Sequence, residues 1–315
     1  VTTQYGADIL RLWVMNSDTA LDLRIGPEIL KQQAELYRRI RNTLRWLLGS
    51  LDGFTDAETV AYTDLPELER WVLHRVSELD ARMREAASSY DWSGVVPALH
   101  DFCNSDLSAF YFDIRKDALY CDAPDSLRRR SARTVLDILH RCLCAWFAPV
   151  LAFTAEEAWL ARFPDEEGSI HLLDFPFVPE GWRDAALAEK WVRVRAIRRR
   201  ITGVLESMRQ TGDLKGSLQA KLTLYGKSGD ALLLDDASWA EVGIVSTTKT
   251  AIDVDLKVVD GVQHGFFPDG EPTVMYSLET ATGTKCDRCW RVLPEVGLSP
   301  VHPTLCRRCE AVVTA

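Results

Sequence analysis

The sequence lacks the short patterns that mark most enzyme active sites. It has no glycine-rich phosphate loop, no HExxH, no G-x-S-x-G and no G-x-G-x-x-G, and its six histidines are dispersed. Nothing stands out as a nucleophile or a general base, so the sequence predicts no catalytic residue. Taken by itself, it describes a binding region.

Long apolar runs and an excess of positive charge are also missing. No stretch approaches the ~20 apolar residues that a membrane-spanning helix needs, and the polar and charged residues at the start do not form a signal peptide. We therefore expect no membrane partner. The net charge of −9 disfavours general adhesion to polyanions, so a nucleic-acid contact has to come from local basic faces. With 47% hydrophobic residues in 315, the chain is expected to form about two or three folded domains.

The eight cysteines are unevenly distributed. Four are scattered through the helical part, and four lie in the last thirty residues as two CxxC pairs. Cys142 and Cys144 are two positions apart in a helical pattern, so their side chains point apart and do not bridge. This usage is typical of a reducing cytoplasm with a metal site, and we expect a cytoplasmic protein. The scattered residues are Cys103, Cys121, Cys142 and Cys144.

Apolar residues recur at helical spacing over most of the first 163 residues. Short connectors between long amphipathic helices predict an antiparallel bundle. Thr154 and Glu157 have the spacing of a capping box that starts a short helix after Pro149. The other expected helices run from Pro27 to Gly49, from Pro66 past Ala86, from about Ser93 to Leu119, and from Ser126 past Trp146.

The pattern changes after residue 168. An extended segment with proline, a basic helix over about 184–210, and alternating stretches at 221–225, 252–256 and 273–276 predict a small α/β subdomain. The expected fold class is mainly α: an antiparallel helical bundle, then the α/β subdomain, then a C-terminal zinc finger. The expected domains are a connector (1–25), the bundle (26–168), the crossing segment with the basic helix and α/β subdomain (169–270), and the zinc module (271–315).

The two CxxC pairs predict a structural zinc site. Cys286, Cys289, Cys306 and Cys309 form C-x2-C-x16-C-x2-C, within the spacing of tetrathiolate zinc sites. Sulfur fills all four positions, so the one expected zinc ion activates no water. Basic residues beside the knuckles either neutralise the thiolates or hold RNA phosphates, and Trp290 either stacks on an unpaired base or covers the module. These basic residues are Lys285, Arg288, Arg291, Arg307 and Arg308.

The helix from Pro27 carries a second candidate RNA surface. Lys31, Arg38, Arg41 and Arg45 project within one arc of about 80° opposite the apolar stripe, with no carboxylate inside that arc. Such a ridge suits an RNA backbone, although an ordinary solvated face gives the same pattern. The arginines between positions 193 and 200 are spread around their helix, which favours a partly structural role. Arg128–Arg130 oppose the dipole at a helix start, which points to an external anionic or carboxylate partner.

Several segments resemble class I aminoacyl-tRNA synthetases. Tyr5–Trp13 resembles the segment after the ATP-binding KMSKS loop, and Tyr37–Arg45 resembles the first helix of the anticodon-binding bundle. The terminal knuckles with Arg288-Cys289-Trp290 are similar to the zinc finger that bacterial isoleucyl-tRNA synthetases share with formamidopyrimidine-type DNA glycosylases. The resemblance covers nearly the whole chain and is weakest over 226–270. Further segments similar to the isoleucine enzyme are Asp106–Asp113, Tyr120–Ser126, Phe153–Trp159 and Gly216–Ala220.

The resemblance implies the anticodon-binding, C-terminal part of a ligase that attaches isoleucine to its tRNA through an adenylate. The HIGH and KMSKS motifs and the editing domain of that family are not in this chain. ATP and magnesium are therefore expected only outside it, and the chain alone is expected to be inactive. Isoleucine tRNA is the expected partner, with no duplex DNA, and the protein is expected to be a monomer. Two other hypotheses stay open, a zinc-finger module for DNA binding or repair and a zinc-stabilised scaffold for protein partners.

Overall fold

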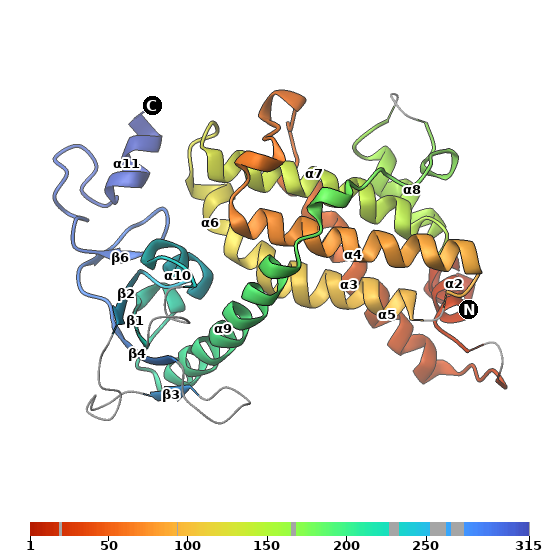
Figure 1. Ribbon diagram of the computed structural model, residues 1–315, viewed down its shortest axis with the longest axis horizontal. Helices are drawn as coiled ribbons and strands as arrows, with labels where there is room; N and C mark the ends of the chain where they lie inside the picture. Colours follow the sequence, from red (N-terminus) through yellow and green to blue (C-terminus); the bar gives the residue numbers. More distant parts are fainter. Residues whose placement is uncertain are drawn as a thin grey trace. The chain divides into compact units, whose positions relative to one another are not determined.

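The structure is a computed structural model that describes residues 1–18, 21–92, 94–164, 168–226, 233–252, 263–265 and 274–314 (Figure 1). The chain divides into two compact units. The first comprises Val1–Leu119 and Pro124–Asp184, and the second comprises Tyr120–Ala123 and Ala185–Ala315. Among the helices described, none is both long and apolar enough to cross a membrane. The finer division into four domains stays a prediction.

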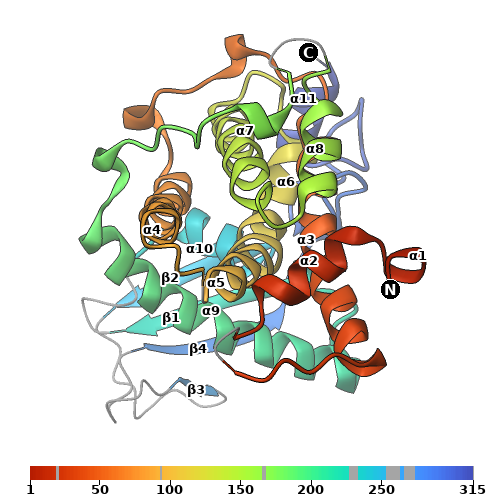
Figure 2. The ribbon, with the colours of Figure 1, turned by 90° about the vertical axis from the view of Figure 1, so that its right-hand side faces the viewer.

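The first unit is a bundle of helices that lie side by side, and successive long helices run in opposite directions (Figures 1 and 2). The antiparallel bundle expected from the sequence is confirmed. Its helices are α1 (Thr2–Tyr5), α2 (Ala7–Met15), α3 (Pro27–Ser50), α4 (Glu67–Ser89), α5 (Val95–Asp101), α6 (Asp113–Cys121), α7 (Leu127–Phe147) and α8 (Ala152–Leu160), with the π-helical segment η3 (Phe102–Phe112) and the 3-10 turns η1 (Asp56–Glu58), η2 (Tyr62–Asp64), η4 (Ile170–Leu172) and η5 (Glu180–Trp182).

The apolar stripes read from the sequence form the core of this bundle. α3 begins at Pro27. Proline is favourable there because the N–H that it lacks would have no intrahelical partner in the first turn. It packs against α2, α7, α8 and η3. Burying each large apolar side chain contributes about 1.5–3 kcal/mol relative to leaving it in water. In α4 the whole predicted stripe is buried: Leu68, Val72, Val76, Leu79, Met83 and Ala86.

The third predicted helix is present, but its middle is not a regular α-helix. α5 continues into η3, whose backbone is π-helical over Phe102–Phe112, and then into α6. The residues predicted to face inward here are buried, including Phe102, Leu107 and Tyr111. The apolar pattern therefore gave the face of this helix correctly, while it carried no signal for the wider turn. Single-turn π-bulges are the usual form, so a segment of this length is uncommon.

The capping box predicted at Thr154 and Glu157 is wrong. Asp8 of α2 caps α8 instead, because its carboxylate accepts hydrogen bonds from the backbone N–H of Thr154 (2.8 Å) and of Phe153 (3.3 Å). The Thr154 hydroxyl also donates to Asp8 (2.6 Å) and contacts the Tyr37 hydroxyl (2.9 Å). A carboxylate at a helix N-terminus satisfies exposed N–H groups and complements the helix dipole. Asp8 thereby ties α2 to α8.

The bundle core also contains a buried ion pair. Glu69 of α4 is fully buried and accepts two hydrogen bonds from the guanidinium of Arg115 of α6, at 2.5 and 2.6 Å. The hydroxyl of Tyr111 donates a third hydrogen bond to Glu69 (3.1 Å). Burial, followed by the nearby carboxylate, raises the pKa of Tyr111 well above its usual value. The phenol therefore keeps its proton, as the donor role requires.

The second unit is a small α/β structure followed by a cysteine-rich module. Its main sheet has the order β2-β1-β4-β3, with β1 and β2 parallel and the other neighbours antiparallel. α10 connects the parallel pair, and α9 packs against β4. The elements are α9 (Ala185–Thr211), η6 (Ser217–Gln219), β1 (Ala220–Gly226), α10 (Asp236–Gly243), β2 (Thr247–Ile252), β3 (Gln263–Gly265), β4 (Val274–Thr280), β5 (Thr284–Lys285), β6 (Val292–Leu293) and α11 (Arg307–Thr314).

The predicted basic helix and two of the three predicted strands correspond to α9, β1 and β4. Most of the third predicted strand, 252–256, lies outside the described residues, which include only Ile252 as the end of β2. β1 is one of the two inner strands and is buried on both faces, through Leu222 and Leu224 on one side and Thr223 on the other. The α/β subdomain expected before the zinc module is thus confirmed.

Candidate metal centre and cationic surface

A two-stranded hairpin positions the first cysteine pair. β5 and β6 pair in antiparallel fashion, and Cys286 and Cys289 lie in the turn between them. The N–H of Cys286 donates to the carbonyl of Arg291 (2.9 Å), and the N–H of Trp290 donates to the carbonyl of Cys286 (2.9 Å). These bonds close a tight knuckle that directs both sulfurs to the same side. Gly283 precedes it with φ 124°, where an added Cβ would collide with the backbone of Leu293.

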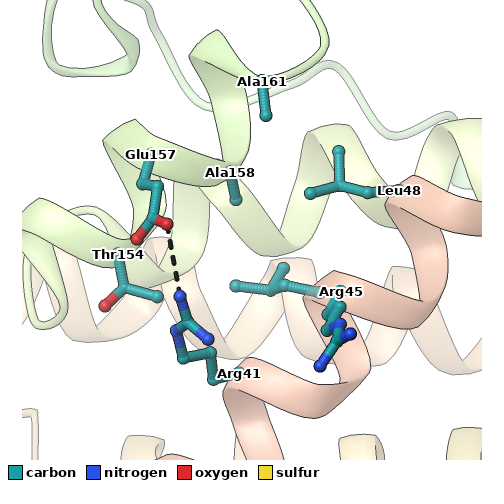
Figure 3. A pocket seen from close by; sticks show the side chains of 8 residues that line it. Arg41, Arg45, Leu48, Thr154, Glu157, Ala158 and Ala161 are labelled. Atoms are coloured by element: carbon teal, nitrogen blue, oxygen red, sulfur yellow. Dashed lines mark hydrogen bonds and ion pairs between the residues drawn. The ribbon is translucent and has the colours of Figure 1, made fainter.

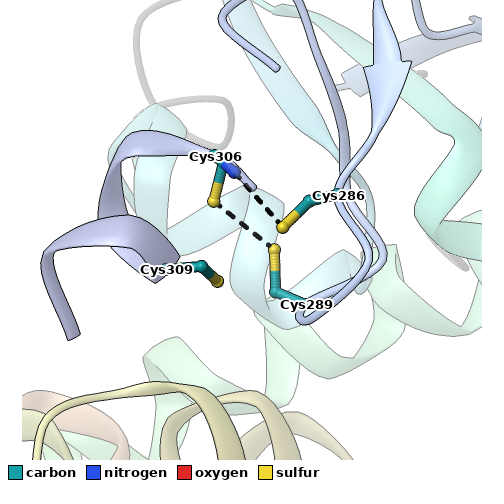
Figure 4. A group of neighbouring side chains, drawn as sticks. All are labelled: Cys286, Cys289, Cys306 and Cys309. Carbon is teal, nitrogen blue, oxygen red and sulfur yellow. Dashed lines mark hydrogen bonds between the residues drawn. The ribbon is translucent and has the colours of Figure 1, made fainter. Parts of the chain in front are cut away.

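A second knuckle brings the other two sulfurs to the same point. Cys306 immediately precedes α11, Cys309 lies in its first turn, and the N–H of Cys306 donates to the sulfur of Cys286 (3.3 Å). All four Sγ atoms lie within 4.8 Å of one another (Figure 4). The predicted ligand set is therefore assembled in space.

The spacing of the sulfurs fits zinc and not a disulfide. Metal–sulfur bonds of about 2.3 Å in a tetrahedron place neighbouring sulfurs about 3.8 Å apart. The sulfurs of Cys289 and Cys306 are 3.7 Å apart. A disulfide needs about 2.05 Å, and none of the eight cysteines is in one. Four soft thiol ligands with no further donor in the group suit a closed structural zinc site.

The thiols of this group differ in how easily they ionise. Burial opposes ionisation of Cys286, but hydrogen bonds from the backbone amides of Cys289 and Cys306 outweigh it and lower its pKa to about 7. Burial raises the pKa of Cys309 to about 11, and it raises the pKa of Cys289 as well. Zinc binds thiolates, so metal binding here has to displace protons.

The cysteines are also the core of this module. The buried cluster contains the four sulfur ligands, Val296 and Cys121, with Leu293 and Leu305 packed against it. Two or three aliphatic side chains bury too little apolar surface to hold such a segment in one conformation, so the metal is expected to supply most of its stability. Cys121 comes from the segment 120–123, and its sulfur lies 3.7 Å from the carbonyl of Arg288.

Three of the arginines near the knuckles make contacts within the protein. Arg288 donates to the backbone carbonyls of Cys121 and Tyr120. Arg308 forms an ion pair with Asp122 (3.2 Å). Arg291 donates through Nε to the carbonyl of Ser246 (3.0 Å). The hydroxyl of buried Ser246 accepts from the N–H of Val292 (2.7 Å), so this serine joins the hairpin to the main sheet.

The remaining members of the predicted set around the knuckles face solvent. Trp290 is 60% exposed, so it is not the lid of the module. Its φ of 65° is unusual for a residue other than glycine. Lys285 lies over its ring, with Nζ 5.2 Å from the ring centroid. Arg307 is exposed, and in the described part of the chain it has no ion pair.

The cationic ridge on α3 is exposed but is less uniform in charge than predicted. Arg38 pairs with Glu35 on the same helix (2.7 Å), and Arg41 pairs with Glu157 of α8 (3.2 Å). Lys31 and Arg45 are exposed and have no ion pair among the described residues. The arc itself carries no carboxylate, but the neighbouring turn and the neighbouring helix each supply one.

A cavity of about 360 Å³ opens between α3 and α8 (Figure 3). Arg41 and Glu157 face each other across the gap, and the methyl groups of Ala158 and Ala161 point into it. The complete lining is Arg41, Leu44, Arg45, Leu48, Thr154, Glu157, Ala158 and Ala161. The arginines of this lining are among the residues predicted from the sequence, whereas the sequence predicts Glu157 only as a helix cap.

Two of the arginines at the start of α7 have partners within the protein, and the partner of Arg128 is a carboxylate. Arg128 pairs with Asp117 of α6 (3.1 Å), and Arg130 donates to the backbone carbonyl of Glu58 (3.2 Å). In α9, Arg198 donates to the carbonyl of Val242 (2.8 Å), in line with the partly structural role predicted for that cluster. Ser126 provides the N-cap of α7 by accepting from the N–H of Arg129.

Comparison with known families identifies the class of protein. Residues 69–224 match the anticodon-binding domain of tRNA ligases, and residues 283–312 match the zinc finger found in FPG and IleRS. The second match contains all four sulfur ligands.

The relatives then specify the ligase. The chain is 55% identical to the isoleucine–tRNA ligase of Gluconobacter oxydans (strain 621H) over 100% of its own length and 31% of that protein. It is 43% identical to the one of Agrobacterium fabrum (strain C58) over 99% of its own length and 32% of that protein. The chain belongs to the isoleucine–tRNA ligase family, matches the C-terminal third of its members, and spans about a third of the length of these relatives.

Among solved structures, the chain is similar to one in the ternary complex of LeuRS, tRNA and LeuAMS from Agrobacterium radiobacter K84. The TM-score is 0.44 at 12% identity, over 72% of this chain and 22% of that chain. Similarity at this level supports no conclusion about binding.

Proposed function

We propose that this chain is the tRNA-docking part of an isoleucine–tRNA ligase, which attaches isoleucine to its tRNA with ATP through an aminoacyl-adenylate. The observation that carries the proposal is the match of residues 69–224 to the anticodon-binding domain of tRNA ligases, together with the family zinc finger at 283–312. ATP and magnesium are proposed to act in the part of the enzyme outside this chain. The enzyme is proposed to be a cytoplasmic monomer.

Exposed cations supply the attraction to RNA in this proposal. The protein carries a net charge of −9, so phosphate contacts depend on surfaces where cations are not neutralised. Lys31 and Arg45 on α3 meet that condition, because neither has an ion pair among the described residues. Arg41 and Arg38 are on the same face and can exchange a solvent-exposed carboxylate for a phosphate at little expense, since exposed ion pairs contribute little.

The zinc module is proposed to supply a second contact with RNA. Metal binding fixes the knuckle that holds Trp290 outward, and Lys285 and Arg307 place positive charge beside it. An exposed tryptophan offers a flat surface on which an unpaired base stacks, worth about 1–3 kcal/mol per base. Arg288, Arg291 and Arg308 are proposed to act indirectly, by holding this module in place through their contacts with the protein.

A role in DNA repair is not favoured. The zinc finger alone is shared with FPG, but the helical match and the relatives belong to tRNA ligases. Equilibrium titration of the chain with isoleucine tRNA and with duplex DNA, over a range of salt concentrations, tests the proposal. We expect the tRNA to bind more tightly at each salt concentration. Equal affinity for the two nucleic acids would contradict the proposed tRNA-docking function.

The Arg45→Ala variant tests the α3 surface. Losing one phosphate contact should weaken tRNA binding and reduce the slope of log affinity against log salt by roughly 0.7–0.9. Lys116→Ala is the matched control, because Lys116 is an exposed cation of the same unit that lies on α6 and not on α3. It should leave the slope unchanged. Equal effects of the two variants would mean that α3 is ordinary solvated surface.

A further inference from the structure

The cavity between α3 and α8 combines an apolar floor with a charged mouth. Leu44 is 2% exposed and Ala158 is 6% exposed, and both line the cavity together with Leu48 and Ala161. Its volume of about 360 Å³ is at the lower end of the range for small-ligand sites, roughly 300–1,000 Å³. A phosphate group is hydrated and gains nothing from an apolar floor, whereas the face of a planar aromatic ring does.

One wall of this cavity is fixed by buried contacts. The hydroxyl of Thr154 donates to Asp8 (2.6 Å) and contacts the hydroxyl of Tyr37 (2.9 Å), and the backbone N–H of Thr154 also donates to Asp8. Thr154 is therefore satisfied within the protein and is not a recognition group. Its bonds hold the start of α8 beside α3, so the gap is a built feature of the bundle.

The polar groups at the mouth are available to a ligand. The ion pair of Arg41 with Glu157 is a single hydrogen bond of 3.2 Å, and the side chains are 47% and 67% exposed. Exposed pairs of this kind are weak, so either partner can turn to a ligand at little expense. The guanidinium offers a fork of N–H donors, and the carboxylate offers two acceptor oxygens.

We propose that this cavity binds one unpaired guanine base of a bound RNA. Guanine has two adjacent acceptors, O6 and N7, which match a guanidinium, and two adjacent donors, N1–H and the N2 amino group, which match a carboxylate. Arg41 takes the acceptor edge and Glu157 takes the donor edge, while the ring lies on Leu48 and Ala158. Arg45 at the rim, which has no ion pair among the described residues, holds the phosphate of the same nucleotide.

The other bases match this mouth less well. Adenine and cytosine each offer one exocyclic amino donor to Glu157 and no second ring N–H beside it, and uracil has a single ring N–H between two carbonyl groups. Each therefore leaves one oxygen of Glu157 without a donor when the site is filled. A good bidentate contact discriminates by about 1–3 kcal/mol, which is roughly fivefold to 150-fold in affinity.

The inference rests on the proposed tRNA-docking function, but it can be tested separately from it. The probes are guanosine, adenosine and cytidine 5′-monophosphates, added to the chain with 13C-labelled alanine methyl groups. We expect guanosine monophosphate to shift the methyl signals of Ala158 and Ala161, with an affinity about tenfold or more above that of the other two nucleotides. Glu157→Gln should abolish this preference, because an amide presents one acceptor and one donor.

A second variant closes the cavity without disturbing the fold. Ala161 is exposed at the end of α8, so Ala161→Leu is expected to fold normally while its side chain fills the cavity. It should remove the response to every nucleotide and lower the affinity for tRNA, and Lys116→Ala should do neither. Absence of any shift with guanosine monophosphate, or equal shifts with all three nucleotides, overturns the inference.

The two proposals fail in different ways. If the chain binds tRNA with unchanged affinity in the Ala161→Leu variant, the cavity inference is wrong and tRNA docking stands. If guanosine monophosphate binds selectively but tRNA does not bind, the cavity is a guanine site and the docking function is wrong.

Discussion

Replacing one zinc ligand should separate the metal-dependent part of the molecule from the rest. In Cys306→Ser a hydroxyl replaces a sulfur that lies 3.7 Å from the sulfur of Cys289. The backbone N–H of residue 306 also donates a hydrogen bond to the sulfur of Cys286. A serine hydroxyl stays protonated at neutral pH and is a poor zinc ligand, so the site becomes three-coordinate in protein ligands. The helical unit contains none of the four ligands and should keep its structure.

The expected size of the effect follows from the ligand count. Structural zinc sites bind with an apparent free energy of about 10–16 kcal/mol. If four thiolates share it evenly, each supplies roughly 3 kcal/mol, which is about a hundredfold in dissociation constant. Competition with a chelator, with zinc measured by mass spectrometry, should show one ion per chain in the parent and a loss of that order in the variant.

The same site predicts a direction of pH dependence. Burial holds the pKa of Cys309 at about 11 and raises that of Cys289, so both thiols carry protons near pH 7 when no metal is bound. Zinc has to displace both protons, and its affinity should fall by at least about a hundredfold for each pH unit of acidification. Cys286 contributes less to this pH dependence, because its pKa of about 7 means that about half of this thiol is already ionised near pH 7.

Cys121→Ser is the matched control. This cysteine lies in the same buried cluster but outside the group of four sulfurs. It should retain one zinc ion per chain with nearly parental affinity. If Cys121→Ser releases zinc as readily as Cys306→Ser, or if Cys306→Ser holds zinc as tightly as the parent, the four-sulfur assignment is refuted.

Two further predictions concern buried groups of the helical unit. Arg115→Met should destabilise this unit by about 3–5 kcal/mol in urea unfolding, because Glu69 is left buried without its cationic partner. Adding Glu69→Leu should restore most of this stability. A loss below about 1 kcal/mol in the single variant would contradict the prediction. Burial, aided by Arg162, lowers the pKa of His140 from 6.5 to about 4. The free energy of unfolding is therefore highest above pH 6.5, where the imidazole is neutral in both states, and it should fall by about 3 kcal/mol as the pH is lowered towards 4. NMR should show this imidazole neutral at pH 5, and titration near 6.5 would contradict the prediction.

Long helices and the metal ligands could be predicted because each depends on local sequence. The apolar residues of α4 recur with the helical period over about five turns, and chain neighbours alone determine that pattern. The CxxC spacing likewise determines the shape of each knuckle. By contrast, α10 has only eight residues, too few to establish a period, and β2 has half-buried threonines in place of an alternating apolar face. Neither element was predicted.

The capping of α8 shows why the remaining details could not be predicted. Thr154 and Glu157 have the right spacing to cap each other, and nothing nearby in the sequence argues against it. The actual cap is Asp8, 146 positions away from Thr154, which reaches the helix only after α2 has packed beside it. Glu157 is thereby released to pair with Arg41 and to line the cavity. The capping box predicted from the sequence therefore gave Glu157 a structural role, whereas in the structure this residue lines the cavity.

Contacts within the protein reduce the number of lysines and arginines that can bind RNA. The sequence contains 37 lysines and arginines, but a guanidinium that already serves two backbone carbonyls, as Arg288 does, would have to break both bonds to hold a phosphate. Exposed cations without such bonds give up only water. The salt dependence of tRNA binding should therefore reflect a few side chains, on α3 and around Trp290. Removing the arginines that bind backbone carbonyls should lower the stability of the second unit before it changes the slope of log affinity against log salt.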